Sequence, residues 1–414
     1  MFTGRVEESV CSSASDVTER NFFAQTLNSK PIGSFPNELL TLSPHLFDYS
    51  KSVRDFMAFY PFIAAEQAYP RNQWYVAAWS HEVGEAPLMR MIAGERIILY
   101  RQRSGSVAAV SALCPHRQMP LETAEIVNDQ IVCPYHGAAF GSDGVCAHLP
   151  FQKHVPAGMN LKSFHVVDHA PFIWLWVGSE ETPDLNRLPF ARCLQPEAGQ
   201  TLLFGLKTFH VQARSQIVLE NLFDQSHISF THPLTLGQRC AANGSTRPSE
   251  IIDEENYLAF MRLSPPKATD EALHALFPAL SAQMRIRSRS ELFGVGLVIS
   301  AGSEIIACDE EGEPTSSVGD LVFFHAITPE TQHSTHYFAG IMRNFALNDQ
   351  DLSNSYAERN DQVVSEDIRV LEAIEPHLAE ADARKEPNFV TDAAAVRVRR
   401  RIEALMGNAP AHCV

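Results

Sequence analysis

Two short clusters of cysteine and histidine constrain this chain more than any other feature of its 414 residues. The first reads Cys114-Pro115-His116-Arg117 and the second Cys133-Pro134-Tyr135-His136-Gly137, with residues 117 to 132 between His116 and Cys133. One Cys and one His from each cluster can place two thiolates on one iron and two imidazoles on the other iron of a [2Fe–2S] cluster. The spacing therefore predicts two loops that meet at one iron–sulfur cluster.

Structural zinc is the alternative, because two cysteines and two histidines also complete a tetrahedral zinc site. Zinc motifs usually group Cys with Cys and His with His, whereas each cluster here supplies one of each. This pairing favours iron and sulfide. Asp143-Gly144, between Phe140 and Val145, is typical of a hairpin turn just after the second cluster.

Composition excludes several classes of protein. The chain is 45% hydrophobic and 20% charged, which is typical of a globular protein. Its formal net charge of −16 argues against a nucleic-acid partner. Apolar runs such as 170–178 fall short of the ~18 residues that cross a bilayer, and the N-terminus lacks a secretory signal pattern. Outside the two clusters the cysteines follow no spacing pattern, so we expect a cytoplasmic protein with neither membrane segment nor disulfide framework.

The pattern of the chain predicts three parts. Residues 1–68 are expected to form an N-terminal extension with an amphipathic helix between Leu46 and Tyr60. Residues 69–182, which hold all four tryptophans and both clusters, are expected to form a small β domain. Its predicted strands include Trp74 to Trp79, Arg96 to Arg101, Val107 to Leu113 and Ala170 to Gly178. Residues 183–414 are expected to form a second domain, after a linker over Glu180 to Pro189.

The second domain alternates helical and strand-like patterns, which predicts an α+β fold with an antiparallel sheet packed against helices. Predicted helices cover Ser215 to Thr231, Leu352 to Glu375 and Asp392 to Met406, and predicted strands cover Leu292 to Ser300, Leu321 to Ile327 and His336 to Arg343. The basic run from Arg397 to Arg401 is expected to mark a solvated face of the last helix.

A second metal site is predicted around Asp224, His227 and His232. On a regular helix the two histidines would point roughly 140° apart, so they converge on one ion only if the helix ends or widens between them. Thr231-His232-Pro233 supplies such an end, because a residue before proline disfavours the α conformation. Two histidines and one carboxylate form the facial triad of non-haem Fe(II) oxygenases. Read by themselves, the two histidines would more often be structural, but the iron–sulfur motif upstream favours a role as metal ligands.

The third ligand is expected on the helix over residues 360–372. Asp367 shares an apolar face with Val364 and Leu371, while Glu366 is rotated by about 100° and is expected nearer to solvent. Asp361 lies on the inward face as well, so helical periodicity leaves two candidates.

Several segments carry a family resemblance from about residue 69 to 406. The chain resembles the Rieske non-haem iron oxygenases, in the group of the vanillate O-demethylase and dicamba monooxygenase oxygenase components. The matching segments are Tyr69 to Ala77, Tyr337-Phe338, Met342 to Phe345, Ser365-Glu366-Asp367 with Val370-Leu371-Glu372, and Asp392 to Val398. The match of the carboxylate helix favours Asp367 over Asp361.

The resemblance implies a Rieske domain, a catalytic domain of helix-grip type, and a role for individual residues. The implied cluster ligands are Cys114, His116, Cys133 and His136, and the implied iron ligands are His227, His232 and Asp367. Asp224 is similar to the family's bridging aspartate, which links an iron-ligand histidine to a cluster-ligand histidine of a neighbouring subunit. His325 aligns with a substrate-contacting histidine of this group, although a structural histidine on a strand fits the pattern equally well.

The function implied by the resemblance is that of a terminal oxygenase that uses O2 to oxidise a small aromatic substrate, with O-demethylation of a methoxylated aromatic acid favoured. The chain has no G-x-G-x-x-G motif, so electrons are expected from a separate NAD(P)H-dependent ferredoxin-type reductase. Family members are typically head-to-tail homotrimers. The alternatives are ring dihydroxylation, N-demethylation, and a Rieske electron-transfer protein without catalytic iron.

Overall fold

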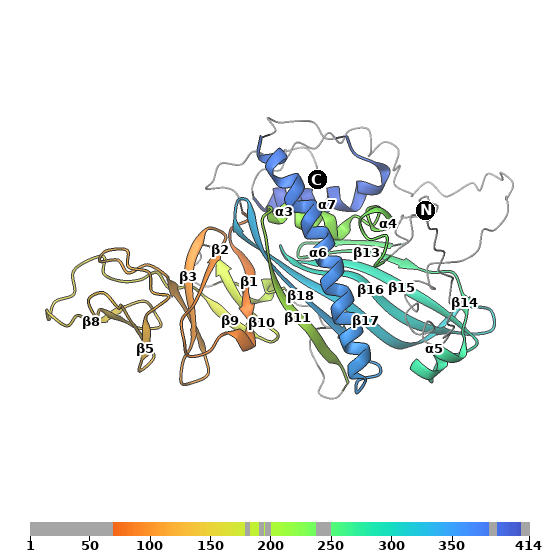
Figure 1. The fold of residues 1–414 in the computed structure, drawn as a ribbon, viewed down its shortest axis with the longest axis horizontal. Helices are drawn as coiled ribbons and strands as arrows, with labels where there is room; N and C mark the ends of the chain where they lie inside the picture. The colour runs from red at the N-terminus through yellow and green to blue at the C-terminus, as the bar shows by residue number, and fades with distance from the viewer. Residues whose placement is uncertain are drawn as a thin grey trace, which may run out of the picture.

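The computed structural model describes residues 69–178, 183–189, 194, 200–236, 250–380 and 387–406. In these ranges, three small antiparallel sheets form the N-terminal part, and one large antiparallel sheet with helices forms the C-terminal part (Figure 1). The predicted α+β fold, with an all-β first domain, is confirmed. The predicted extension over 1–68 and its helix lie outside the described residues, and the boundary between 182 and 183 stays a prediction.

The N-terminal part contains ten short strands. They form three sheets, in the order β1 (Gln73–Trp79), β10 (Phe172–Val177), β9 (Val166–His169); β2 (Leu88–Ile92), β3 (Glu95–Arg101), β4 (Val107–Ser111); and β5 (Glu125–Val127), β6 (Gln130–Val132), β7 (Ala139–Phe140), β8 (Cys146–His148). The predicted turn at Asp143-Gly144 connects β7 to β8, and Gly144 adopts a left-handed φ of 81° there.

The large sheet pairs its strands in the order β11 (Leu202–Val211), β18 (Ser334–Arg343), β17 (Pro314–Thr331), β16 (Leu297–Cys308), β15 (Gln283–Phe293), β13 (Tyr257–Leu263), β12 (Glu250–Glu254), with β14 (Lys267–Ala268) beside β15. Strands β15 to β18 follow one another as antiparallel hairpins, and β-bulges shift the register at several points, for example between Arg289 and Glu291. Side chains from one face of this sheet point towards the helices that cover it.

The two parts of the molecule share a buried core. Every residue of β10 is buried, because one side faces its own domain and the other side faces the large sheet. Trp79 of β1 stacks on Phe172 with ring centroids 4.9 Å apart, and it meets Phe338 of β18 edge-on at 5.7 Å. Thr328 Oγ1 of β17 also donates a hydrogen bond to the Val76 carbonyl of β1, at 2.7 Å. The small domain is therefore packed firmly against the large sheet.

Helices cover one side of the sheet. They are α3 (Ser215–Phe223), α4 (Ile228–Thr231), α5 (Glu271–Leu276), α6 (Gln350–Glu380) and α7 (Ala393–Leu405), with 3-10 turns at Ser80–Glu82, Leu185–Arg187 and Val390–Asp392. The long helix α6 crosses the sheet (Figure 1). Its buried side chains recur every three or four residues, at Ser353, Tyr356, Asn360, Val364, Asp367, Leu371 and Glu375. Among the described helices, none combines the length and apolar character needed to cross a membrane.

A buried ion pair fixes the C-terminal half of α6. Glu375 accepts hydrogen bonds from the Arg214 backbone at 3.0 Å, from Arg214 Nη2 at 2.9 Å and from His333 Nδ1 at 2.7 Å. We expect Glu375→Ala to lower the free energy of unfolding by about 3 kcal/mol, because the mutation leaves the Arg214 charge largely buried without a partner. Urea unfolding measures this change. The matched control Glu358→Ala, at an exposed position of α6, should stay within about 0.5 kcal/mol of wild type. Equal effects of the two mutations would contradict the role of the ion pair.

Two predictions of secondary structure and one prediction of exposure were wrong. The helix predicted over 215–231 is interrupted at Asp224, because Asp224 Oδ1 accepts hydrogen bonds from the Ser226 amide at 2.7 Å and the Ser226 hydroxyl at 2.6 Å. The strand predicted over 292–300 is two strands joined by a turn in which Gly294 has a φ of 58°. The basic run is not a solvated face, since Arg399 is 5% exposed and donates to Glu220 of α3 at 2.6 Å.

Candidate metal centres and cavity

The two Cys/His clusters form loops with the same backbone geometry. In the β4–β5 loop, the Cys114 amide donates to the Met119 carbonyl and the Gln118 amide donates back to Cys114, both at 2.9 Å. In the β6–β7 loop, the Cys133 amide donates to Ala138 at 2.8 Å and the Gly137 amide returns to Cys133 at 3.0 Å. The fifth residue of each loop has a left-handed φ, 57° at Gln118 and 71° at Gly137. Both loops therefore turn back sharply after presenting their side chains.

These loops bring the four predicted cluster ligands together. Cys114 and Cys133 are buried, at 1% and 2% exposure, and interact with each other. The imidazoles of His116 and His136 lie nearer to solvent, with their Nδ1 atoms 3.1 Å apart. Two thiolates in the interior and two imidazole nitrogens at the surface suit the two irons of a [2Fe–2S] cluster, each held by one kind of ligand. The four side chains could thus hold the cluster.

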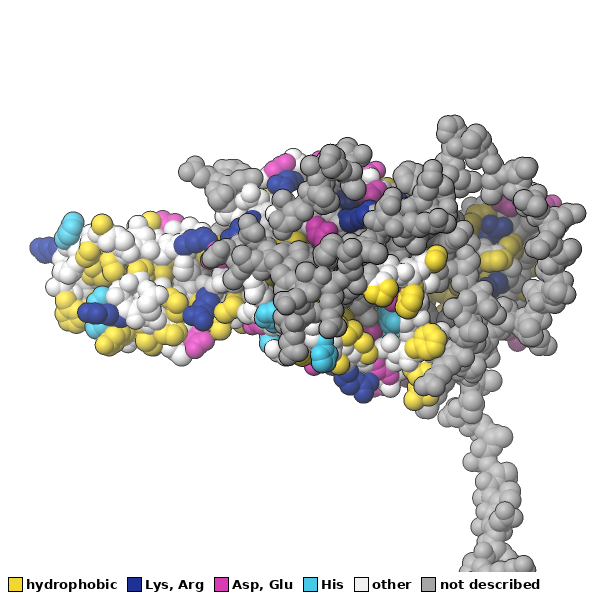
Figure 2. Space-filling model, turned by 90° about the horizontal axis from the view of Figure 1, so that it is seen from above, with side chains coloured by type: hydrophobic (Ala, Val, Ile, Leu, Met, Phe, Trp, Pro, Cys, Tyr) yellow, Lys and Arg dark blue, Asp and Glu magenta, His cyan; other side chains and the backbone are white. Residues whose placement is uncertain are grey.

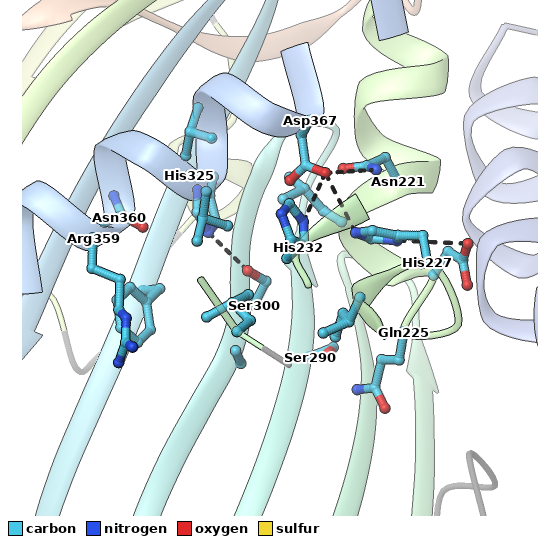
Figure 3. Close-up of a pocket in the computed structure, with 18 of the residues that line it drawn as sticks. Asn221, Gln225, His227, His232, Ser290, Ser300, His325, Arg359, Asn360 and Asp367 are labelled. Atoms are coloured by element: carbon cyan, nitrogen blue, oxygen red, sulfur yellow. Dashed lines mark hydrogen bonds and ion pairs between the residues drawn. The ribbon is translucent and has the colours of Figure 1, made fainter. Parts of the chain in front are cut away.

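The second predicted site is assembled by α3, α4 and α6. His227 immediately precedes α4 and His232 immediately follows it, so the two rings flank a single helical turn. Asp367 Oδ1 of α6 lies 3.0 Å from His232 Nε2 and 3.4 Å from His227 Nε2. The three ligand atoms are within 4.8 Å of one another (Figure 3). Two imidazoles and a carboxylate at this separation could hold a divalent iron with open positions.

The other candidate for the third ligand points elsewhere. Asp361 forms an ion pair with Lys207 Nζ at 2.6 Å, and its side chain is 36% exposed. Asp361 therefore lies away from the two histidines, while Asp367 lies between them.

Neighbouring carboxylates and an amide orient the three ligands. Glu366 accepts a hydrogen bond from His232 Nδ1 at 2.8 Å, and Asn221 donates to Asp367 at 3.3 Å. The carboxylate of Asp224 lies 3.6 Å from His227 Nδ1, which is longer than a hydrogen bond. Glu366 was expected to lie nearer to solvent than Asp367, and its side chain is 11% exposed against 8% for Asp367, because it bends back to His232. Such outer contacts set the tautomer and ring orientation of metal-ligating histidines.

Charge interactions shift the pKa values of the ligands in the protein without a bound ion. Burial alone would raise the pKa of Asp367, but His227 and His232 lower it to about 2. Burial alone would lower the pKa of His227, but the carboxylates of Asp224 and Asp367 raise it to about 9. The cluster of opposite charges keeps the carboxylate ionised, which is the form that a metal ion requires.

A cavity of about 130 Å³ opens beside the three ligands. It is bounded by α3, α6 and the face of the sheet, and most of the surface that faces it is apolar, with contributions from Leu222, Ile228, Leu236, Phe323, Val363 and Val364. His325 of β17 also lines this cavity and is 3% exposed. Its Nε2 is hydrogen-bonded to Ser300 Oγ at 2.8 Å and its Nδ1 to the Tyr337 hydroxyl at 2.9 Å. These two partners, which sequence patterns did not reveal, hold the His325 ring at the cavity wall.

His325 gives the protein a specific pH dependence. Burial lowers the pKa of His325 to about 4, below the ordinary value of about 6.5 that it has when unfolded. Between these values the unfolded chain binds a proton that the folded chain does not, so the free energy of unfolding falls as the pH falls from 6.5 towards 4. We expect His325 alone to lower the free energy of unfolding by about 2 kcal/mol when the pH falls from 7 to 5. Urea unfolding of wild type and His325→Gln at both pH values measures the difference, and parallel changes in the two proteins would contradict it.

Comparison with protein families matches both parts of the chain. Residues 73–165 match the Rieske [2Fe-2S] domain, and residues 211–407 match the vanillate O-demethylase oxygenase C-terminal domain. The oxygenase component of dicamba O-demethylase from Stenotrophomonas maltophilia is 34% identical over 81% of this chain and 97% of its own length. The chain belongs to the Rieske non-haem iron oxygenases. It falls in the group of the dicamba and vanillate O-demethylase oxygenase components, as predicted.

Further relatives agree with this assignment. The vanillate O-demethylase oxygenase subunit of a Pseudomonas species is 30% identical over 82% of this chain and 95% of its own length. The crystal structure of dicamba monooxygenase with non-heme iron and dicamba is similar with a TM-score of 0.68, at 29% identity over 82% of this chain and 98% of that one. This Rieske oxygenase is therefore an enzyme whose cofactors are a [2Fe–2S] cluster and a mononuclear iron. Oxygenase components of the family work with separate electron-transfer partners.

Proposed function

We propose that this Rieske oxygenase is the terminal component of a monooxygenase that O-demethylates a methoxylated aromatic acid. The observation that carries the proposal is the pairing of His227, His232 and Asp367 with a largely apolar cavity directly beside them. An apolar cavity suits an aromatic ring, and an iron held by these three residues would supply dioxygen activation next to it. The names of the dicamba and vanillate relatives support methyl ethers as the substrate class.

The two cofactors supply electrons and activated dioxygen when they are bound. In this proposal Cys114, His116, Cys133 and His136 hold the cluster, and His227, His232 and Asp367 hold the iron. The substrate methyl C–H bond becomes C–OH, with the second oxygen atom of O2, two electrons and two protons leaving as water. The hemiacetal then breaks its methyl C–O bond, which gives the phenol and formaldehyde.

The residues around the cavity orient these reactants. Glu366 fixes the His232 ring through Nδ1, which leaves Nε2 directed at Asp367. The ring of His325 stays neutral because its pKa is about 4, and its two nitrogens are hydrogen-bonded to Ser300 and Tyr337, so it lines the cavity without carrying a charge. The apolar wall keeps bulk water out of the cavity, which limits side reactions with water at the iron site.

Two exposed apolar surfaces of the protein support electron transfer between neighbouring subunits. The cluster loops lie at the far end of the molecule from α4 (Figure 1). Hydrophobic and histidine side chains reach the surface of this N-terminal part (Figure 2). Tyr135 and Phe151 near the cluster are 59% and 88% exposed, and Phe230 and Leu234 near the iron ligands are 64% and 90% exposed. These two apolar surfaces support a head-to-tail homotrimer in which Asp224 relays electrons between centres of neighbouring subunits, supplied by an NAD(P)H-dependent reductase.

An assay of oxygen uptake and formaldehyde release tests this function. Purified protein, a surrogate reductase and NADH are incubated with a panel of methoxybenzoates. The proposal predicts formaldehyde and the matching phenol from at least one member, in proportion to the oxygen consumed. Oxygen uptake with a hydroxylated ring that retains its methoxy group would instead indicate ring hydroxylation.

N-Dealkylation is the second candidate. A relative named as the oxygenase component of chloroacetanilide N-alkylformylase, from Rhizorhabdus wittichii, is 28% identical over 81% of this chain. Adding N-methyl and N-alkyl anilides to the panel separates the two reactions, because each leaves a different product.

A further inference from the structure

The cavity has two chemically different ends. His227, His232 and Asp367 lie at one end, and Arg359 and Asn360 of α6 lie at the other, with His325 between them (Figure 3). Among the described residues that line the cavity, Arg359 is the one Lys or Arg. The end remote from the iron ligands is therefore positively charged, while the iron end carries the carboxylates.

Neither polar side chain at the remote end has a partner among the described residues. Arg359 forms no hydrogen bond or ion pair there, although it is partly buried. Asn360 is 6% exposed, and its buried Nδ2 donates no hydrogen bond. Several largely buried arginines in the described part of the chain are matched by carboxylates, namely Arg214 by Glu375, Arg289 by Asp320 and Arg399 by Glu220, while the fully buried Arg343 donates to the Asp349 carbonyl and the Ser353 hydroxyl. A guanidinium in the cavity wall without a counter-charge can bind an anionic ligand there.

A carboxylate is the ligand that fits this guanidinium. It carries the opposite charge to Arg359 and can accept two parallel hydrogen bonds from the planar group. Arg359 stands on a regular helix, so its position relative to the iron ligand is fixed. Eight residues of α6 separate Arg359 from Asp367, which corresponds to about 12 Å along the helix axis. A bound acid group is thus held well away from the iron end.

We propose that Arg359 binds the carboxylate of the substrate, and that the preferred substrates carry the methoxy group across the ring from the acid. This inference rests on the proposed O-demethylation and specifies its substrate. Para and meta methoxybenzoates can place the acid at Arg359 and the methyl group near the iron ligands. An ortho methoxybenzoate has both groups on the same edge of the ring and cannot span the two ends.

Two substrates of the same shape isolate the charge contact: 4-methoxybenzoate and the neutral 4-methoxybenzamide. For Arg359→Gln we expect KM for the acid to rise roughly 10- to 100-fold, because a charged hydrogen bond is lost, and KM for the amide to change less than about twofold. Arg359→Lys should recover part of the affinity, since it restores the charge without the planar fork. Arg369→Gln, an equal change of charge at an exposed position of α6, is the matched control and should behave as wild type.

Binding without turnover provides the second readout. Calorimetry of the oxidised protein should show the same loss of affinity for 4-methoxybenzoate in Arg359→Gln, and weak binding of 2-methoxybenzoate to wild type. Equal losses for the acid and the amide, or 2-methoxybenzoate as the best substrate, would overturn the inference. If wild type releases formaldehyde from no methyl ether, the proposed function fails, and the calorimetric comparison of acid and amide still decides the role of Arg359.

Discussion

Replacing Asp367 by alanine is expected to abolish O-demethylation while the visible absorption of the [2Fe–2S] cluster stays unchanged. Asp367 Oδ1 lies between His227 Nε2 and His232 Nε2, so the mutation removes the only carboxylate that is close to both rings in the described part of the chain. Two imidazoles alone leave the ion with too few ligands. Metal analysis should therefore fall from about three irons per chain to about two.

Asp361→Ala is the matched control on the same helix. Helical periodicity places Asp361 on the inward side as well, but its carboxylate pairs with Lys207 at a partly exposed position. Loss of a partly exposed ion pair costs no more than about 1 kcal/mol, and iron content and turnover should remain near wild type. If Asp367→Ala retains iron and turnover, or if the cluster absorption disappears with them, the assignment of Asp367 to a separate iron site is wrong.

Replacing Asp224 by asparagine is expected to lower turnover roughly 10- to 100-fold with both cofactors in place. The side chain keeps its size but loses the negative charge that lies 3.6 Å from His227 Nδ1. Burial raises the pKa of Asp224, but His227 and Ser226 lower it below its ordinary value, so the wild-type residue is ionised at neutral pH. Steady-state turnover, iron content and cluster absorption should be measured on the same preparation.

The separate readouts distinguish electron transfer from metal binding. The proposal for Asp224 predicts that the cluster is reduced at the wild-type rate but is reoxidised slowly in the presence of substrate and O2. Wild-type turnover in Asp224→Asn would contradict that role. A loss of iron in proportion to the loss of turnover would assign Asp224 to holding His227 instead.

The features of the fold and the site that could be predicted from the sequence depend on local patterns. The cluster loops are readable because each supplies its ligands within three or four consecutive residues, and His227 and His232 flank one helical turn. The strands of the N-terminal part are readable because their apolar runs are bounded by turn residues. The break at Asp224 was also readable in principle, since Asp-x-Ser favours a turn, but the helical periodicity around it concealed that signal.

Contacts between distant segments could not be predicted. Periodicity gives the direction in which Glu366 leaves its helix, but its partner His232 lies 134 residues earlier in the chain. The same limit applies to His325, whose ring is held by Ser300 and Tyr337 from the two neighbouring strands. Arg359 carries no sequence signal at all, because its role depends on the missing counter-charge around it in the folded chain. These contacts of the site can therefore be identified only from the folded chain.

A single-turnover experiment tests the central claim most directly. Protein that contains both cofactors is chemically reduced, freed of excess reductant, and mixed with O2 and 4-methoxybenzoate without any reductase. If the chain is an O-demethylating oxygenase, formaldehyde and 4-hydroxybenzoate appear in equal amounts, approaching one of each per iron site, as the cluster is reoxidised. Reoxidation of the cluster in iron-replete, substrate-bound protein without release of formaldehyde would contradict the claim that this chain is an O-demethylating oxygenase.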